Sequence, residues 1–480
     1  MKLSLKSLSH RYSDMSQARR SGFWFMVCNY ITRATAFITV PVFTRLLTTS
    51  QYGLTNTYIA WFDIFVIFTS LNLPYEGLNN ILIRWEDKKN ACVSSIASLT
   101  VTLTALFSLV FLVFRKNVLE FTGLSPFLMA FMFVQLTFNP PMYIWINSRK
   151  FDFDYRKPVA VTVCFTLLSP LLSVLAIIYT PYKAEARIIA LSSVQGLFGL
   201  IMYLSMLARG KTFFDREIWS FALRFNLPLL FYYLSVVVLN EADRVQIGKL
   251  CGQNATAIYS VAYSAAAIIK IGVTAISSSY HPWLNKKLKA NDCDGISSSG
   301  EKLFLLVGVL CIVMSALAPD LVRLMATAEY IKASSVIPPV TASAYFIFVY
   351  QMLANVSLYF EKTRVISLIS VIAAVLNVIL NDIFIRKFGF TAAGWTTLAS
   401  YLFLTVLHYL LYRKTIKHFG LNGRMFCEKR LLTLSAAVIL GCCVMSLSYV
   451  LGAWRYAVAL ALIFAMLLAF GVIRKEVKKK

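Results

Sequence analysis

Long apolar runs, separated by short polar segments, recur along the whole chain. Most runs have about 18 to 25 residues, which is the length that an α-helix needs to cross a bilayer. Lys, Arg, Asp and Glu lie mainly in the segments between the runs. This pattern predicts fourteen membrane-spanning helices, at residues 22–46, 52–72, 91–114, 124–147, 158–180, 187–208, 225–242, 256–281, 303–326, 335–358, 365–385, 391–412, 431–451 and 455–473.

The composition places the chain among integral membrane proteins. Of its 480 residues, 58% are hydrophobic, and the mean hydropathy is +0.68, values that exclude a soluble domain. The first run resembles a signal peptide, but it is too long, contains Asn29 and Arg33, and has no small-residue cleavage site. The nine cysteines form no C-x-x-C motif, so we expect neither structural disulfides nor a zinc or other metal site.

The net charge of +25 is carried mainly by alternate loops. Because all loops are short, the positive-inside rule applies and places both termini of this multi-pass chain in the cytoplasm. The same distribution argues against a nucleic-acid partner. The basic leader, residues 1–21, and the basic tail from residue 474 suit anionic lipid headgroups. Helical spacing of Leu5, Leu8, Tyr12 and Met15 also allows the leader to lie on the membrane as an amphipathic helix.

The chain contains an internal repeat. Residues 190–196 align with 394–400, and Gly53-Leu54 aligns with Ala257-Ile258 at the same offset. Each repeat has six spans, and because six is even, the two repeats run in parallel. We therefore predict an all-α integral membrane fold with two parallel six-helix lobes in a V around a central cavity. The expected divisions are a leader (1–21), an N-lobe (22–208), a C-lobe (209–424) and two extra C-terminal helices with the tail (425–480).

Three ionisable residues lie deep inside predicted spans, at similar predicted depth: Arg33, Asp63 and Lys270. A charge at such a position costs roughly 2.5 to 3.5 kcal/mol, and such residues usually line a bundle interior or a wet pathway. Alternatively, Arg33 and Asp63 pair to hold the first two spans together. Asp63 is also a candidate site for coupling to protons or sodium, and the membrane potential is another source of energy.

Charged residues and prolines near span ends are candidates for gates and hinges. Glu241, Asp243 and Arg244 are expected where the seventh span meets the outer face, and Asp382 with Arg386 at the end of the eleventh. They are either gate pairs or ordinary interfacial ion pairs. Pro41 and Pro228 are candidate hinges, since proline weakens a helix. His281 and His408 have no partner that suggests catalysis or metal binding, so both are expected to pack.

Three stretches resemble one transporter family. Residues 41–54, PVFTRLLTTSQYGL, look like the opening signature of the polysaccharide-exporter branch of the multidrug/oligosaccharidyl-lipid/polysaccharide (MOP) flippase superfamily. Residues 243–252 with 257–260 resemble its seventh-to-eighth span junction, although the family usually has Gly where Ala257 stands. Residues 390–395, with the span ending at 412–414, resemble its twelfth span.

This resemblance implies a flippase for undecaprenyl-pyrophosphate-linked oligosaccharide, the repeat unit of O-antigen or of capsular or exopolysaccharide. Such a protein alternates between cytoplasmic and periplasmic access, needs no cofactor, and works beside membrane lipids, a polysaccharide polymerase and a chain-length regulator. Arg33 and Lys270 would then bind the pyrophosphate, because cations bind phosphate oxygens well. Intramembrane amides would contact sugar hydroxyls or hold helices together; the candidates are Asn29, Asn139, Asn226 and Asn355.

Two other functions fit a polytopic chain. A multidrug or cation antiporter of the same superfamily needs an acidic cavity, whereas this chain places two cations and one acid at mid-depth. A membrane polysaccharide polymerase or glycosyltransferase generally needs a large outer loop with catalytic residues. The predicted outer loops are short. The D-x-D pattern Asp152-Phe-Asp154 is expected in a charged cytoplasmic turn. A non-enzymatic carrier is therefore predicted.

Overall fold

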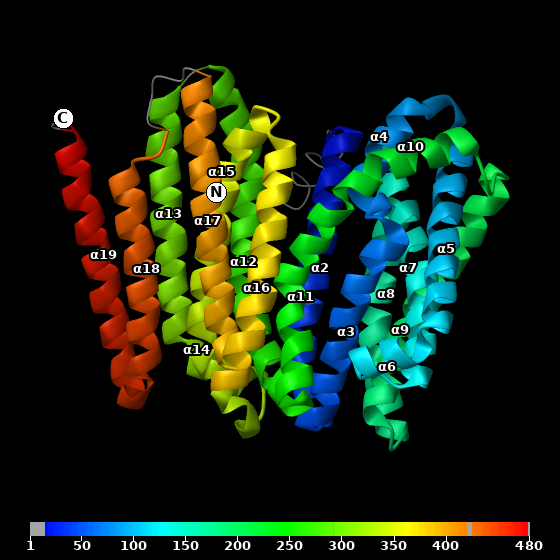
Figure 1. Cartoon of the computed structure of the whole chain (residues 1–480), viewed down its shortest axis with the longest axis horizontal. Helices are drawn as coiled ribbons and strands as arrows, with labels where there is room; N and C mark the ends of the chain where they lie inside the picture. The colour runs from blue at the N-terminus through cyan, green and yellow to red at the C-terminus, as the bar shows by residue number, and fades with distance from the viewer. Residues whose placement is uncertain (1–14, 291, 420–424, 479–480) are drawn as a thin grey trace, which may run out of the picture. The chain divides into compact units, whose positions relative to one another are not determined.

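The computed structural model describes residues 15–290, 292–419 and 425–478, and its elements in this part of the chain are all helical (Figure 1). The expected amphipathic leader lies almost entirely outside the described residues, as do Lys479 and Lys480 of the basic tail. The first half contains α2 (Gln17–Leu46), α3 (Thr49–Ser70), η1 (Leu73–Gly77), α4 (Leu78–Arg84), η2 (Glu86–Lys88), α5 (Lys89–Val113), α6 (Arg115–Thr122), α7 (Pro126–Phe151), α8 (Arg156–Tyr179), α9 (Lys183–Gly210), α10 (Arg216–Asn226) and η3 (Leu227–Leu229). The second half contains α11 (Leu230–Cys251), α12 (Gln253–Lys289), α13 (Cys293–Ala316), α14 (Ala318–Met325), η4 (Ala328–Ser335), α15 (Ile337–Tyr359), α16 (Thr363–Phe388), α17 (Ala392–His418), α18 (Glu428–Leu447), η5 (Ser448–Trp454) and α19 (Arg455–Lys478).

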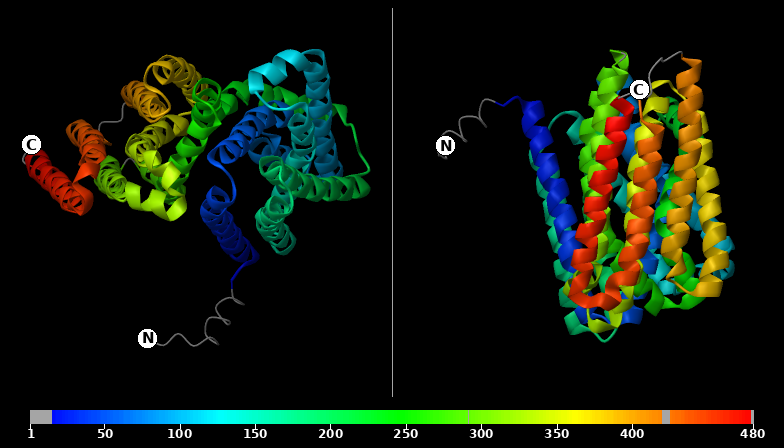
Figure 2. Two further views of the ribbon diagram at one scale, coloured as in Figure 1. Left: turned by 90° about the horizontal axis from the view of Figure 1, so that it is seen from below. Right: turned by 90° about the vertical axis from the view of Figure 1, so that its left-hand side faces the viewer.

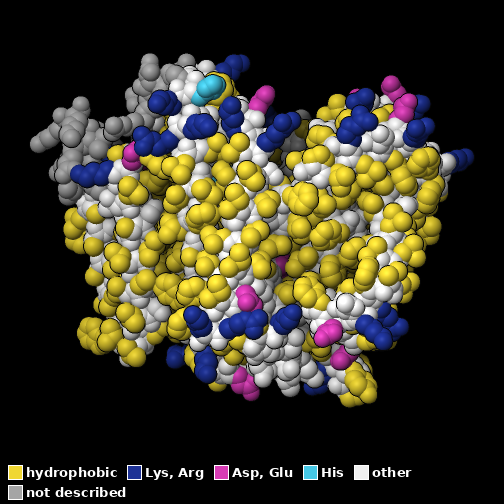
Figure 3. Space-filling view, viewed as in Figure 1, with side chains coloured by type: hydrophobic (Ala, Val, Ile, Leu, Met, Phe, Trp, Pro, Cys, Tyr) yellow, Lys and Arg dark blue, Asp and Glu magenta, His cyan; other side chains and the backbone are white. Residues whose placement is uncertain are grey.

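The predicted all-α membrane fold is confirmed. Twelve stretches of the described chain are long and apolar enough to cross a membrane. One of them, Glu428–Gly471, contains both α18 and α19, which meet at a kink at Gly452. The 22-residue helix α3 accounts for a further predicted span. Apolar side chains cover the middle of the visible face and charged ones gather towards the helix ends (Figure 3), as lipid and water require.

The predicted end of one span, at residue 326, is wrong, and proline explains the error. The span expected at 303–326 ends at Ala316, and a separate short helix, α14, starts with Pro319 in its first turn. The span expected at 225–242 lies within the longer apolar stretch Arg216–Cys251, in which Pro228 occupies the 3-10 turn η3 between α10 and α11. Helix α11 then continues to Cys251. Proline lacks an N–H and clashes with the preceding turn, so a helix begins or ends there unless neighbours compensate.

The chain forms two compact units. The first comprises Met1–Gln51 and Tyr58–Leu234, and the second Tyr52–Thr57 and Ser235–Lys480. In the first unit α9 packs on α7 and α8, and α5 packs on α7; in the second α17 packs on α15 and α16, and α13 packs on α15. These pairs follow the same order along the two predicted repeats. The first unit includes α10, which follows the boundary expected after residue 208.

Two features of α7 depend on its neighbours: its close approach to α9 and the prolines inside it. A Cβ on Gly199 would lie 2.0 Å from the backbone oxygen of Phe138, so only glycine lets α9 approach α7 this closely. In α7, Pro140 cannot donate to the Leu136 carbonyl. The Thr104 hydroxyl of α5 lies 3.3 Å from that oxygen and shares its proton between it and the Thr100 carbonyl, which is 2.9 Å away. Helix α7 continues through its proline pair.

The two extra C-terminal helices belong to the second unit, where α18 and α19 both pack on α13 (Figures 1 and 2). Near the start of α18, Arg430 forms a buried ion pair with Glu301 of α13. At the start of α19, Arg455 donates to the Ala316 carbonyl at 3.0 Å and pairs with Asp320 at 2.5 Å. Polar contacts thus fasten the hairpin at both ends.

The beginning of α3 is tightly packed in the second unit. A Cβ on Gly53 would lie 1.9 Å from the backbone oxygen of Gln253, and Thr57 donates to the Gln253 side chain at 2.7 Å. The Tyr52 ring meets the Tyr330 ring edge-on, with centroids 6.2 Å apart. The glycine in the signature of residues 41–54 therefore has a steric reason.

We predict that Gly53→Ala destabilises the folded protein by about 1 to 3 kcal/mol, the usual cost of overpacking, because the new methyl group meets backbone. The measurement is the melting temperature of the detergent-purified protein. Gly272→Ala is the matched control, since no heavy atom lies within 4 Å of its added Cβ. Equal melting temperatures for Gly53→Ala and the unmodified protein would refute this steric reason.

Candidate functional site

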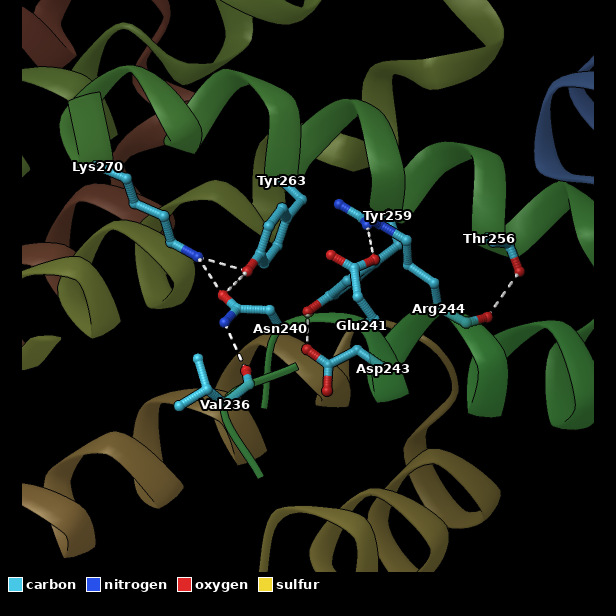
Figure 4. Close-up of polar contacts among 9 residues, drawn as sticks. All are labelled: Val236, Asn240, Glu241, Asp243, Arg244, Thr256, Tyr259, Tyr263 and Lys270. Carbon is cyan, nitrogen blue, oxygen red and sulfur yellow. Dashed lines mark hydrogen bonds and ion pairs between the residues drawn. The ribbon is translucent and has the colours of Figure 1, made fainter. Parts of the chain in front are cut away.

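In the second unit, Lys270 is held by neutral oxygens (Figure 4). Its ammonium group donates to the Tyr263 hydroxyl and, at 3.3 Å, to the Asn240 side-chain oxygen. Tyr263 also donates to that oxygen, at 2.9 Å, so Asn240 of α11 orients both groups of α12. Within the described residues, no carboxylate forms an ion pair with Lys270. Its charge remains available to an anion.

The candidate gate pairs each lie within one helix. Arg244 pairs with Glu241 one turn earlier in α11 (Figure 4), and Arg386 pairs with Asp382 in α16 at 2.9 Å, largely exposed. An ion pair inside a single helix stays intact when helices separate. These two pairs therefore do not by themselves latch one helix to another.

Asp243, by contrast, is a fully buried carboxylate that joins four helices. It accepts hydrogen bonds from Tyr259 of α12, from Asn381 of α16 at 2.6 Å and from Thr397 of α17 at 2.7 Å. Thr396 donates in turn to the Asn381 side-chain oxygen. The structure thus shows Asp243 as the centre of an interhelical cluster and not as an outer-face ion pair.

This cluster can neutralise its charge in two ways. A buried ionised carboxylate is costly unless it is paired, and the groups that donate to Asp243 are all neutral. A proton on the carboxyl group removes the cost. A small hard cation does so too, because carboxylate, hydroxyl and amide oxygens are the ligands that such ions prefer.

A second hydrogen-bond network lies in the first unit. The Tyr58 hydroxyl of α3 donates to the Gln135 side-chain oxygen of α7 at 3.1 Å, and Ser192 of α9 donates to the same oxygen at 3.2 Å. The Gln135 amide donates to Gln195 at 2.8 Å, and Asn139 donates to the same Gln195 oxygen at 2.8 Å. The amide group of Gln195 is therefore fixed in position.

This network forms one wall of a pocket of about 310 Å³. Asp63 of α3 lies in the pocket, together with Tyr75 of η1 and Tyr143 of α7. The structure thus brings Asp63 and Asn139, two of the sequence candidates, into one site.

Arg33 is half-buried in α2 and forms no ion pair within the described residues, so the expected pair with Asp63 is not present. Helix α2 packs instead on α8, where the Thr32 and Thr166 hydroxyls are 3.4 Å apart. Asn29 is exposed one turn before Arg33. Pro41 lies inside α2, which continues to Leu46, while Pro228 lies in a helix connection.

The other two asparagine candidates have structural contacts. Asn226 is fully buried at the end of α10 and donates to the Ala222 carbonyl at 2.9 Å. Asn355 of α15 lies 2.6 Å from the His281 ring. His281 therefore has a polar partner that the sequence did not suggest. His408 stacks on Tyr350, in keeping with a packing role.

Sequence reasoning identified Asn139 but missed Gln135, Gln195 and Asn381, which organise the two networks. Gln135 and Asn139 are four residues apart on α7, and Asn377 and Asn381 are four apart on α16. This spacing places each pair on one helix face. Two amide residues four positions apart in an apolar run are therefore a sequence signal that could have identified the polar face of each helix.

Comparisons with known proteins agree with this architecture. A family model described as "Polysaccharide biosynthesis protein" matches residues 18–287, and the MatE model matches residues 228–383. An uncharacterized membrane protein of Methanocaldococcus jannaschii is 20% identical over 435 residues, covering 84% of this chain and 85% of that protein.

Two solved structures have a similar fold. The lipid II flippase MurJ in an inward closed conformation has a TM-score of 0.67 at 12% identity, covering 95% of this chain and 99% of its own. An inward-facing multidrug resistance MATE family transporter of the MOP superfamily has a TM-score of 0.61 at 12% identity, covering 83% of this chain and 96% of its own.

We predict that the thermal stability of the purified protein depends on sodium concentration or on pH, and that Asp243→Asn removes this dependence. The substitution keeps the size of the side chain but removes the charge that a cation or proton neutralises. The measurement is the melting temperature in sodium chloride against choline chloride, and across pH. Asp382→Asn, which removes an exposed carboxylate, should leave the dependence intact. An Asp243→Asn protein that responds as the unmodified protein does would contradict this role.

Proposed function

Because the chain belongs to the polysaccharide biosynthesis protein family of the MOP flippase superfamily, we propose that it is a flippase for lipid-linked oligosaccharide. Its substrate is an undecaprenyl-pyrophosphate-linked repeat unit of O-antigen, capsule or exopolysaccharide. The protein moves this unit from the cytoplasmic to the periplasmic leaflet by alternating access. It is a carrier and not an enzyme.

The observation that carries this proposal is the pair of cations without ion-pair partners. Arg33 and Lys270 lie in membrane-spanning helices, α2 and α12, and within the described chain neither forms an ion pair. An unneutralised charge in a span is retained for function far more often than for stability. A planar guanidinium and a point-like ammonium suit the oxygens of a pyrophosphate.

The orientation and energy source follow from charge. The positive-inside rule favours cytoplasmic termini in a bacterial inner membrane. Outward movement of an anionic headgroup gains roughly 2.3 kcal/mol per charge for each 100 mV of membrane potential, inside negative. Asp243 is our candidate for proton or sodium coupling in preference to Asp63, because it is fully buried among neutral donors. A polymerase and a chain-length regulator would take up the product.

A multidrug or cation antiporter is the second candidate, supported by the MatE match at residues 228–383. Such a transporter holds positively charged compounds, which Arg33 and Lys270 would repel. A membrane polymerase or glycosyltransferase is a weaker candidate, since residues 152 and 154 form ion pairs with Lys89 and Arg149 in a turn. Both observations favour the flippase.

We predict that deletion of the gene leaves repeat units assembled on their lipid but accessible only from the cytoplasm, with surface polysaccharide lost. The measurement is the labelling of lipid-linked sugars from the periplasmic side, compared with total lipid-linked sugar. Outward-facing units at the normal level in the deletion strain would refute the flippase.

We also predict that Arg33→Ala and Lys270→Ala each reduce surface polysaccharide at least tenfold without lowering the amount of protein in the membrane. The physical reason is loss of a charge that binds the pyrophosphate. Arg364→Ala removes an exposed cation at the start of α16 and serves as the control. Normal export by both variants would make these cations structural.

A further inference from the structure

The pocket of the first unit that contains Asp63 is lined by groups that do not suit a pyrophosphate. Its polar groups come from α3, η1, α7 and α9, and its volume of about 310 Å³ is at the lower end of the range for small-molecule sites, about 300 to 1,000 Å³. Asp63 places a carboxylate in it. A carboxylate repels phosphate, so the occupant is a different part of the substrate.

In this pocket one amide nitrogen, that of Gln195, and one amide oxygen, that of Asn139, remain for a ligand. The Gln195 side-chain oxygen accepts from both Gln135 and Asn139, at 2.8 Å each. Within the described residues, the Gln195 amide nitrogen and the Asn139 side-chain oxygen make no hydrogen bond. Neither is among the buried atoms that lack a partner, so both remain accessible from the pocket. A donor beside an acceptor, both fixed by the same network, fits the hydroxyl groups of one sugar ring.

Tyrosine rings complete the lining. Tyr75 and Tyr143 lie with their centroids 5.6 Å apart at an angle of 39°, and Tyr75 is 50% exposed. An aromatic face packs against the apolar C–H face of a sugar ring, while planar polar groups bind its hydroxyl edge. The Asp63 carboxylate would accept from a hydroxyl in a strong, charge-assisted hydrogen bond.

A turn at the end of α3 shapes the backbone beside the pocket. Leu71, the C-cap of α3, and Asn72 both have a positive φ, 48° and 55°, and the π-turn η1 follows. Asn147 donates to the Pro74 carbonyl at 2.9 Å, which holds the turn and places Tyr75 at the pocket.

We propose that this pocket binds one neutral sugar ring of the glycan, and that it distinguishes neutral sugars from uronic acids. The proposal rests on the function proposed above, since it assigns a second contact to the same substrate. Asp63 excludes an anionic sugar, Tyr75 packs on the ring, and Asn139 with Gln195 bind a pair of hydroxyl groups. The cations bind the pyrophosphate separately.

The test compares lipids that differ only in the sugar. The probes are undecaprenyl pyrophosphate and its derivatives carrying one glucose, one galactose, one N-acetylglucosamine or one glucuronic acid, titrated against the full-length protein in nanodiscs. We expect at least one neutral derivative to bind about tenfold more tightly than the bare lipid, and the glucuronic acid derivative to show no gain.

Variants separate this pocket from the pyrophosphate site. Tyr75→Leu and Asn139→Leu should lower the affinity for the neutral derivative to that of the bare lipid, without changing bare-lipid binding. Tyr75 is half-exposed, so its variant tests the pocket even where Asn139→Leu fails to fold. Tyr359→Leu, at an exposed site in the second unit, is the matched control. Arg33→Ala should weaken binding of every lipid.

Three outcomes overturn the proposal. One is an unmodified protein that binds all sugar-bearing derivatives no better than the bare lipid. Another is a Tyr75→Leu protein that keeps the full preference, and a third is a glucuronic acid derivative that binds as well as the neutral ones. These results leave the flippase proposal standing, whereas failure of every lipid to bind, the bare one included, counts against the flippase itself.

Discussion

Hydrogen bonding without water decides how the helices of each unit pack. Inside hydrocarbon, a buried polar group must find its partner in the protein. The first unit meets this requirement with a network centred on Gln135, and the second with one centred on Asp243. Ser192 in the first network and Thr396 in the second are aligned by the internal repeat. Related positions of the two units thus carry polar contacts between helices.

The two networks differ in charge, and this difference separates the tasks of a carrier. The second unit buries an acid among neutral donors and leaves Lys270 without an ion-pair partner in the described chain. The first unit keeps its amides neutral and places Asp63 in a pocket beside them. Under the function proposed above, anion binding, ion coupling and sugar binding would therefore use different residues of the two units.

Prolines show where sequence reasoning reaches its limit. Pro140 lies inside α7 and the helix continues, and the Thr104 hydroxyl of another helix lies 3.3 Å from the carbonyl that Pro140 leaves free. Pro228 and Pro319 instead stand at helix connections, and the span predicted across Pro319 ended too late. The local sequence is similar in kind at all three places. The outcome depends on a neighbour that comes from elsewhere in the chain.

The sequence alone showed the apolar runs, the internal repeat and the charges inside spans. Hydrophobicity and charge are local properties, and each span must suit the bilayer by itself. The tertiary structure decided which partners the charged residues have: Arg33 does not pair with Asp63, and Asp243 accepts hydrogen bonds from three other helices. It also showed that Asn139 and Gln195 share a pocket. Such partners lie far apart along the chain, and only helix packing brings them together.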